Sequence, residues 1–215
     1  MFTRLALATA LTSLPAMAFA EVELSFYLGA QEAAHSRVFV DDPVIGEEDF
    51  LAAWLGRSFE MPPYYGLRGT YWRNDRFGYG IDFSHSKVYA SDSTLTDNGY
   101  DTLEFTDGVN ILTANAYRRW NDQWGQITPY VGAGVGISIP HVEVTKGGSD
   151  TFEFQIGGPA VALLGGVSYE INDSWAVFGE YKVSYSPLSV DLETDGTLET
   201  DLVINAVNFG VSFSY

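Results

Sequence analysis

The clearest pattern of hydrophobic and polar positions lies at the end of the chain, over Leu202–Tyr215. Large apolar side chains alternate there with small or polar ones, and they fall on one face: Val207, Phe209, Val211, Phe213 and Tyr215. A period of two residues is typical of a β-strand. In a soluble sheet the apolar face would contact a core. In a transmembrane barrel it contacts lipid, while the small polar face lines the lumen.

The same alternation recurs along the chain and predicts seven further strands. Their ranges are Val22–Gln31, Tyr64–Trp72, Phe77–Tyr89, Val109–Trp120, Ile127–Ile139, Pro159–Ile171 and Trp175–Ser186. Aromatic and β-branched residues hold the predicted outward positions in most of them, as expected of lipid-facing strands. The pattern therefore predicts an all-β fold, an eight-stranded antiparallel transmembrane β-barrel.

Asn-Asp pairs mark three predicted turns, at Asn74-Asp75, Asn121-Asp122 and Asn172-Asp173. Asn and Asp tolerate the backbone conformations of tight turns, so each pair predicts a short hairpin connection on the periplasmic side. Four longer extracellular loops are then required. Two of them, Ala90–Gly108 and Pro187–Asp201, are acidic.

The first predicted extracellular loop runs from Glu32 to Pro63. Its segments Ser36–Val40 and Phe50–Phe59 are expected to prolong the strands beyond the membrane. Prolines at the outer strand ends each remove a ladder hydrogen bond. They either create lateral openings in the wall or simply end the strands.

Residues 1–20 read as a secretory signal peptide, with Arg4 before an apolar run and Ala18-Phe19-Ala20 as the cleavage site. The barrel domain is then 21–215, and the expected location is the bacterial outer membrane. No other apolar run approaches the length of a spanning helix. The aromatic terminal residue, Tyr215, resembles the strand end by which the barrel-assembly machinery recognises outer-membrane barrels.

The chain has no cysteine and a formal net charge of −17. Neither a disulfide nor a thiolate metal site is possible, and the acidity argues against nucleic acid as a partner. It fits cation binding, or residence among anionic lipids bridged by cations; a merely solubilising surface explains it equally well.

The predicted lumen holds four acids and three bases beside Asn115: Glu23, Asp82, Glu170, Glu180, Arg68, Arg119 and Lys182. Buried charges must be paired. An eight-stranded barrel is filled by its side chains, so a porin is not expected. The charges form either an ion-pair plug or a catalytic site inside the lumen.

The three histidines, His35, His85 and His141, lie near the predicted outer strand ends. Imidazole and carboxylate are common ligands of catalytic divalent metals. Glu143 shares a strand face with His141, as Arg37 does with His35. The histidines serve as metal ligands or bases, or they are polar rim residues. Strict alternation turns His85 towards lipid unless a bulge re-aims it.

Five stretches resemble the bacterial outer-membrane lipid A oxidases: Glu23–Val38, Met61–Trp72, Tyr79–Ala90, Ile139–Val144 and Phe152–Ala160. The resemblance covers most of the chain after residue 20. It implies oxygen-dependent oxidation of the proximal glucosamine of lipid A to aminogluconate. A divalent cation would assist, with molecular oxygen as co-substrate and hydrogen peroxide as by-product.

For that activity we expect a rim metal bound by His35, His141 and Glu143. Asp82 or His85 would act as base. Three basic residues are expected to bind the phosphates or acidic sugars of lipopolysaccharide: Arg37, Lys87 and Lys146.

Two alternatives remain open. One is a non-enzymatic barrel serving adhesion, membrane integrity or cation bridging of lipopolysaccharide. The other is a lipid A deacylase or acyltransferase, which is weakened because Ser84 and Ser86 cannot pair with His85 across the strand. Convergence of the three histidines and Glu143 on one rim would favour the oxidase, and their placement on separate sides of the barrel would favour the non-enzymatic barrel.

Overall fold

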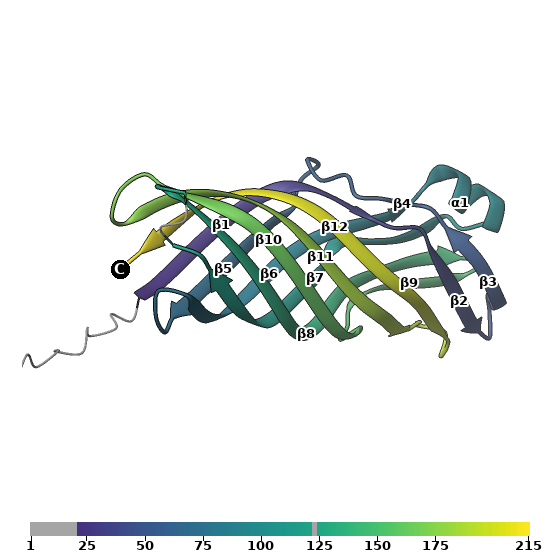
Figure 1. Ribbon diagram of the computed structural model, residues 1–215. Helices are drawn as coiled ribbons and strands as arrows, with labels where there is room; N and C mark the ends of the chain where they lie inside the picture. The colour runs from purple at the N-terminus through teal and green to yellow at the C-terminus, as the bar shows by residue number, and fades with distance from the viewer. Residues whose placement is uncertain (1–20, 122–123) are drawn as a thin grey trace, which may run out of the picture.

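The computed structural model describes residues 21–121 and 124–215, and these form one closed antiparallel barrel (Figure 1). Closure follows from pairing, because β1 is hydrogen-bonded to β5 on one side and to β12 on the other. The wall consists of β1 (Glu21–Ala33), β5 (Tyr65–Trp72), β6 (Phe77–Ala90), β7 (Thr102–Arg119), β8 (Ile127–Lys146), β10 (Gly158–Glu170), β11 (Trp175–Asp191) and β12 (Thr197–Ser214). The predicted all-β, eight-stranded fold is confirmed.

One end of the barrel, here called the short-turn end, carries tight connections. The Asn74 carboxamide oxygen accepts hydrogen bonds from the backbone amides of Arg76 and Phe77, each at 2.9 Å. Asn172 caps its turn in the same way. The third predicted pair, Asn121-Asp122, lies partly outside the described residues, and the predicted signal peptide lies wholly outside them.

The outer surface of the wall carries a belt of exposed apolar side chains. The strand positions predicted to face lipid supply it, among them Leu24, Phe26, Leu67, Ile81, Leu112, Val135, Leu163, Val177, Phe209 and Val211. In water, exposure of such a continuous apolar band would cost free energy. In a bilayer the band contacts the apolar lipid tails, so this cost does not arise. The outward assignment of these residues is therefore correct.

The opposite end, the long-loop end, is more ordered than the sequence predicts. A hairpin of β2 (Ser36–Asp42) and β3 (Gly46–Ala52) extends the sheet beside β12. β4 (Trp54–Leu55) pairs with β6, and β9 (Ser149–Phe154) pairs with β8. The short helix α1 (Asp92–Asn98) is capped by Ser91 and ends at Gly99. None of the helices described is long and apolar enough to cross a membrane.

Several boundaries predicted in this region are wrong. β8 continues to Lys146, past the predicted end at Ile139, and the predicted loop Pro187–Asp201 contains the end of β11 and the start of β12. The expected segment Phe50–Phe59 is divided, because β3 ends at Ala52 and only Trp54–Leu55 pairs with β6. The predicted loop Ala90–Gly108 contains α1 and the first residues of β7, which starts at Thr102. The reason is an apolar core inside this half of the barrel, formed by residues such as Trp54, Phe105, Val142 and Leu198. The strands continue past the belt because they have a core to cover.

Candidate functional site

The lumen between the two ends is blocked by a network of paired charges. Arg68 on β5 donates to Asp82 at 2.8 Å and, through both terminal nitrogens, to Glu180 at 2.9 and 2.8 Å. Lys182 forms a further ion pair with Asp82. These residues are almost wholly buried, with Asp82 at 0% exposure. The expectation that Arg68, Asp82, Glu180 and Lys182 face the lumen and pair there is correct.

This arrangement favours the ion-pair plug over a catalytic site in the lumen. Asp82 also accepts a hydrogen bond from the Tyr27 hydroxyl at 3.0 Å, so both of its oxygens are occupied. A general base needs a free lone pair within reach of the substrate. The predicted role of Asp82 as base therefore has no geometric support, because the apolar core lies between it and the long-loop end.

The outer wall of β6, β7 and β8, just beyond the apolar belt, is irregular. The β6–β7 register shifts between Ser86 and Val88, and the β7–β8 register shifts between Glu104 and Val109. Gly108 has a φ of +96°, and a Cβ there would lie 2.4 Å from the His85 ring. Only glycine therefore lets the bulged strand cover this histidine.

His85 lies on the outer face of β6, between Tyr65 on β5 and Asn110 on β7. It is 5% exposed and stacks on Tyr65 with ring centroids 5.2 Å apart. The Asn110 amide nitrogen donates to the carbonyls of Ile139 and Asp107, so its oxygen faces His85 Nδ1 at 3.0 Å. Nδ1 then carries the proton, which leaves Nε2 as a buried lone pair with no partner.

His141 lies on the outer face of β8, across β7 from His85. It is 3% exposed, and the ring centroids of Phe152 and Phe154 on β9 lie 4.4 and 4.5 Å from the centroid of its imidazole ring. Its Nδ1 is 3.8 Å from Asp107, too far for a hydrogen bond, and has no other partner. We call His85, Asp107, Asn110 and His141 the outer-wall cluster.

The height of the outer-wall cluster on the barrel is set by the register. Phe83, two residues before His85, faces outward on β6. Phe83 pairs with Leu112 on β7, and Leu112 pairs with Ile137 on β8; the side chains of Leu112 and Ile137 are exposed. The cluster therefore lies at the upper edge of the apolar belt. At that height a bilayer presents its headgroups.

A pair of carboxylates, Glu104 and Glu143, lies one step further from the belt. They face each other directly across β7 and β8. Thr106 donates to Glu143 at 2.8 Å. Partial burial and the charge of Glu143 raise the pKa of Glu104 to about 7, although Arg57 and Lys87 oppose the shift.

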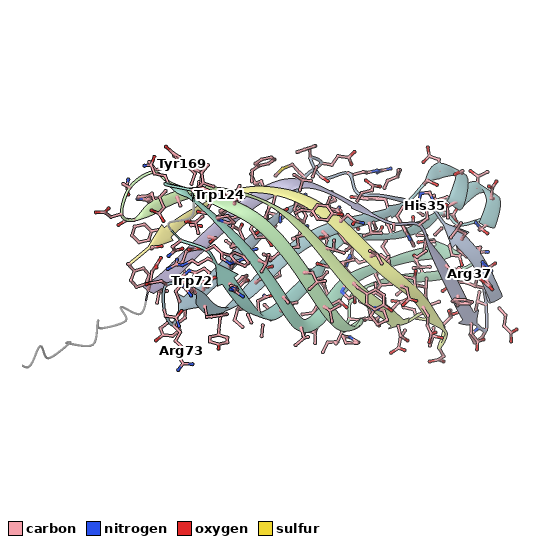
Figure 2. All side chains as sticks on the ribbon, in the orientation of Figure 1. His35, Arg37, Trp72, Arg73, Trp124 and Tyr169 are labelled. Carbon is pink, nitrogen blue, oxygen red and sulfur yellow. The ribbon has the colours of Figure 1, made fainter. Side chains whose placement is uncertain are left out.

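The predicted metal site is not assembled, and the convergence of the three histidines and Glu143 that would favour the oxidase is not found. His35 follows β1, which lies four strands from β8 in the barrel order, on the opposite side from His141 and Glu143. His35 is exposed at the long-loop end, as is Arg37, which pairs with Asp49 (Figure 2). Within residues 21–121 and 124–215, no three His, Asp or Glu side chains lie close enough to hold a metal ion.

The two predicted lysines are also separated. Lys87 is buried two residues beyond His85, where its ammonium approaches the carbonyls of Glu60 and Met61 at 3.4 and 3.3 Å. Lys146 forms an ion pair with Glu48 near α1. Of the predicted site residues, His85, Lys87, His141 and Glu143 therefore share the outer wall of β6–β8. His35, Arg37, Lys146 and Asp82 lie elsewhere.

Sequence reasoning missed Asp107, Asn110 and Glu104. The signal that could have found them is Asp107-Gly108, a turn dipeptide at the predicted start of a strand, which favours a bulge. A bulge there moves its neighbours off strict alternation, so the side chains on either side of it come together.

Comparison with known proteins gives the family and the fold. A family model described as outer membrane protein beta-barrel domain matches residues 6–215. No match is found among curated proteins. Among solved structures, the outer membrane protein AlkL is similar at 16% identity and a TM-score of 0.54, over 100% of this chain and 97% of that one. Neisserial surface protein A is similar at 16% identity and a TM-score of 0.51, over 90% and 96%.

Proposed function

The chain belongs to the outer membrane protein beta-barrel domain family and lies in the outer membrane, and on that premise we propose that it modifies lipid A. The short-turn end then faces the periplasm and the long-loop end faces outward. The proposed reaction is the oxygen-dependent oxidation of the proximal glucosamine to aminogluconate, at the outer-wall cluster. The resemblance of five stretches to lipid A oxidases supports this choice of reaction.

The observation that carries the proposal is the pair of buried histidines with unpartnered ring nitrogens on a lipid-facing wall. Leaving a buried nitrogen without a hydrogen bond costs about 1–3 kcal/mol. The chain accepts this at His85 Nε2 and at His141 Nδ1, on either side of one bulge. Both lie at headgroup height, where the glucosamine sugars of lipid A would be. A substrate hydroxyl would satisfy either nitrogen once the side chains that cover it move aside, because both nitrogens are buried.

The chemistry divides between the substrate, dioxygen and these side chains. The anomeric hydroxyl of the sugar loses its proton, for which the lone pair on His85 Nε2 is the available acceptor. The anomeric carbon gives up its hydrogen with two electrons, and dioxygen takes up two electrons and two protons to become hydrogen peroxide. The resulting lactone adds water and opens to aminogluconate.

The side chains around the two histidines have supporting roles in this proposal. Asp107 lies 3.8 Å from His141 Nδ1, and the rings of Phe152 and Phe154 pack against the imidazole, so these side chains hold the ring of His141 in place. Arg57, which stacks on Tyr89 at 4.3 Å, is the basic group placed to contact a phosphate. No three ligand side chains of the described residues come together to hold the divalent metal that the resemblance implies, so no step of the oxidation is routed through one.

A set of three alanine variants tests the proposal. We expect His85→Ala to lower the yield of oxidised lipid A by about 100-fold or more, as loss of a general base does. His141→Ala should also lower the yield, because it removes a group that contacts the substrate. His35→Ala is the matched control and should keep full activity, because His35 lies on the far side of the barrel. The measurement is mass spectrometry of lipid A after incubation with each folded barrel. Full activity in both outer-wall variants would remove the centre of the proposal.

A second candidate is a non-enzymatic barrel that binds lipopolysaccharide through bridging cations. The specific observation in its favour is the Glu104–Glu143 carboxylate pair, held together just beyond the belt. Carboxylate oxygens suit Mg²⁺ and Ca²⁺, and lipopolysaccharide phosphates would complete the coordination. The sealed lumen agrees with a function performed on the outer surface.

The raised pKa of Glu104 gives this second candidate a pH signature. Between the ordinary glutamate pKa of about 4.3 and about 7, the folded state keeps a proton that the unfolded state loses. Stability should therefore fall as the pH rises through that window. Glu104→Gln should flatten this slope, measured by urea unfolding at several pH values; Glu199→Gln on β12 is the control. An unchanged slope would contradict the assignment of the pair.

A further inference from the structure

We propose a second binding site, at the periplasmic mouth of the barrel, for a small organic cation with primary amines. The site is a cavity of about 310 Å³ inside the short-turn end. Arg68, Tyr130 and Phe178 line its inner end, where the ion-pair network closes it. The outer-wall cluster lies on the other side of the wall and nearer the other end, so this site is separate from the proposed function.

The charges that line the cavity favour a cation. Arg68 forms ion pairs with Asp82 and Glu180, and Arg119 forms an ion pair with Glu21 at 2.7 Å. Glu23 and Glu170 also line the cavity, and neither belongs to an ion pair of the described residues. The positive groups are thus already neutralised, while four lining carboxylates, those of Glu23, Asp75, Glu170 and Asp173, have no ion-pair partner among the described residues. An anionic ligand would meet net repulsion here.

A buried group without a partner points to a ligand independently of these acids. Tyr117 lines the cavity and is 3% exposed, and its buried hydroxyl has no hydrogen-bond partner among the described residues. Such a group is costly unless something else bonds to it. An ammonium group would donate to the Tyr117 oxygen.

The remaining lining matches an amine chain. Trp72 and Tyr130 supply aromatic faces that attract cations. The Arg119 guanidinium lies 4.1 Å from the Trp72 ring centroid, so this ring attracts cations but the face that Arg119 covers is already occupied. Hydroxyls from Ser25, Thr70 and Thr128 can accept hydrogen bonds from a primary amine. A linear polyamine is narrow enough for a cavity of this size between strands.

Calorimetric titration of the folded barrel in detergent micelles with spermidine tests this site. Saturable binding is expected, with no binding of N-acetylglucosamine or acetate. Glu23→Gln removes one free carboxylate, and Tyr117→Phe removes the unpartnered hydroxyl while keeping the ring. Each should weaken spermidine binding; for Glu23→Gln we expect about tenfold or more, as for a charged hydrogen bond.

The control is Glu47→Gln, which removes the same charge at the far end of the barrel and should leave the affinity unchanged. Folding of each variant is checked by its electrophoretic shift on heating. Unsaturable heats, an equal loss in Glu47→Gln, or binding of the neutral sugar in place of spermidine would each overturn the proposal. None of these results bears on lipid A oxidation, which is measured separately.

Discussion

Replacing Arg68 with methionine should destabilise the barrel by about 3–5 kcal/mol, the usual cost of removing one partner from a buried ion pair. Among the residues that the structure describes, Arg68 alone contacts both carboxylates as a cation, since it donates to Asp82 and twice to Glu180. Without it, Glu180 keeps only the neutral donors Tyr130 and Asn208. A buried carboxylate without a counter-charge is unfavourable in the narrow lumen.

Reversible urea unfolding in lipid vesicles measures this effect. The matched control is Arg37→Met, because the Arg37–Asp49 pair is exposed and such pairs contribute about 0–1 kcal/mol. A loss below about 1 kcal/mol in Arg68→Met, equal to that of the control, would mean that the network does not hold the lumen together.

Trp54→Ala should also destabilise the protein by about 3–5 kcal/mol, as large-to-small changes of a buried tryptophan do. Trp54 is 1% exposed within the apolar core of the long-loop half. Its ring packs against Phe105 with centroids 6.2 Å apart, and its indole nitrogen donates to Ser36 at 2.8 Å. The substitution removes the packing and leaves the Ser36 hydroxyl with one partner fewer.

The same unfolding measurement applies, with Phe59→Ala as control. Phe59 lies on the connection that follows β4 and is 82% exposed, so its loss should change stability by less than about 0.5 kcal/mol. If Trp54→Ala were as mild, the strands beyond the belt would have to be held by their backbone ladder and not by the core.

The fold could be predicted because lipid makes the outward face of each strand uniformly apolar. The alternation in Leu202–Tyr215 placed Phe209 and Val211 outside and Asn208 inside, as the structure has them. The same rule placed Arg68, Asp82, Glu180 and Lys182 in the lumen, and their pairing followed from the cost of buried charge.

The site could not be predicted to the same extent, because alternation stops describing the strands where the belt ends. Inside the long-loop half the lumen is apolar, so Val38 and Leu198 point inward and reverse the membrane pattern. The β7 bulge joins Asp107 to His141, and no period of two can place it. The three histidines do lie in the long-loop half. However, the predicted order of eight sequential strands already separates strand one, which precedes His35, from strand five, which precedes His141, and the expected metal site overlooked this.

The most direct test of the proposed function is the mass spectrum of lipid A incubated with the folded wild-type barrel, once in air and once under nitrogen. Oxidation at the outer-wall cluster predicts the gain of one oxygen atom on the proximal sugar and release of hydrogen peroxide, in air alone. An unchanged lipid A spectrum in air, from a barrel whose folding is verified in the same sample, would contradict the oxidase. The surface would then be better explained as a cation-bridged anchor for lipopolysaccharide.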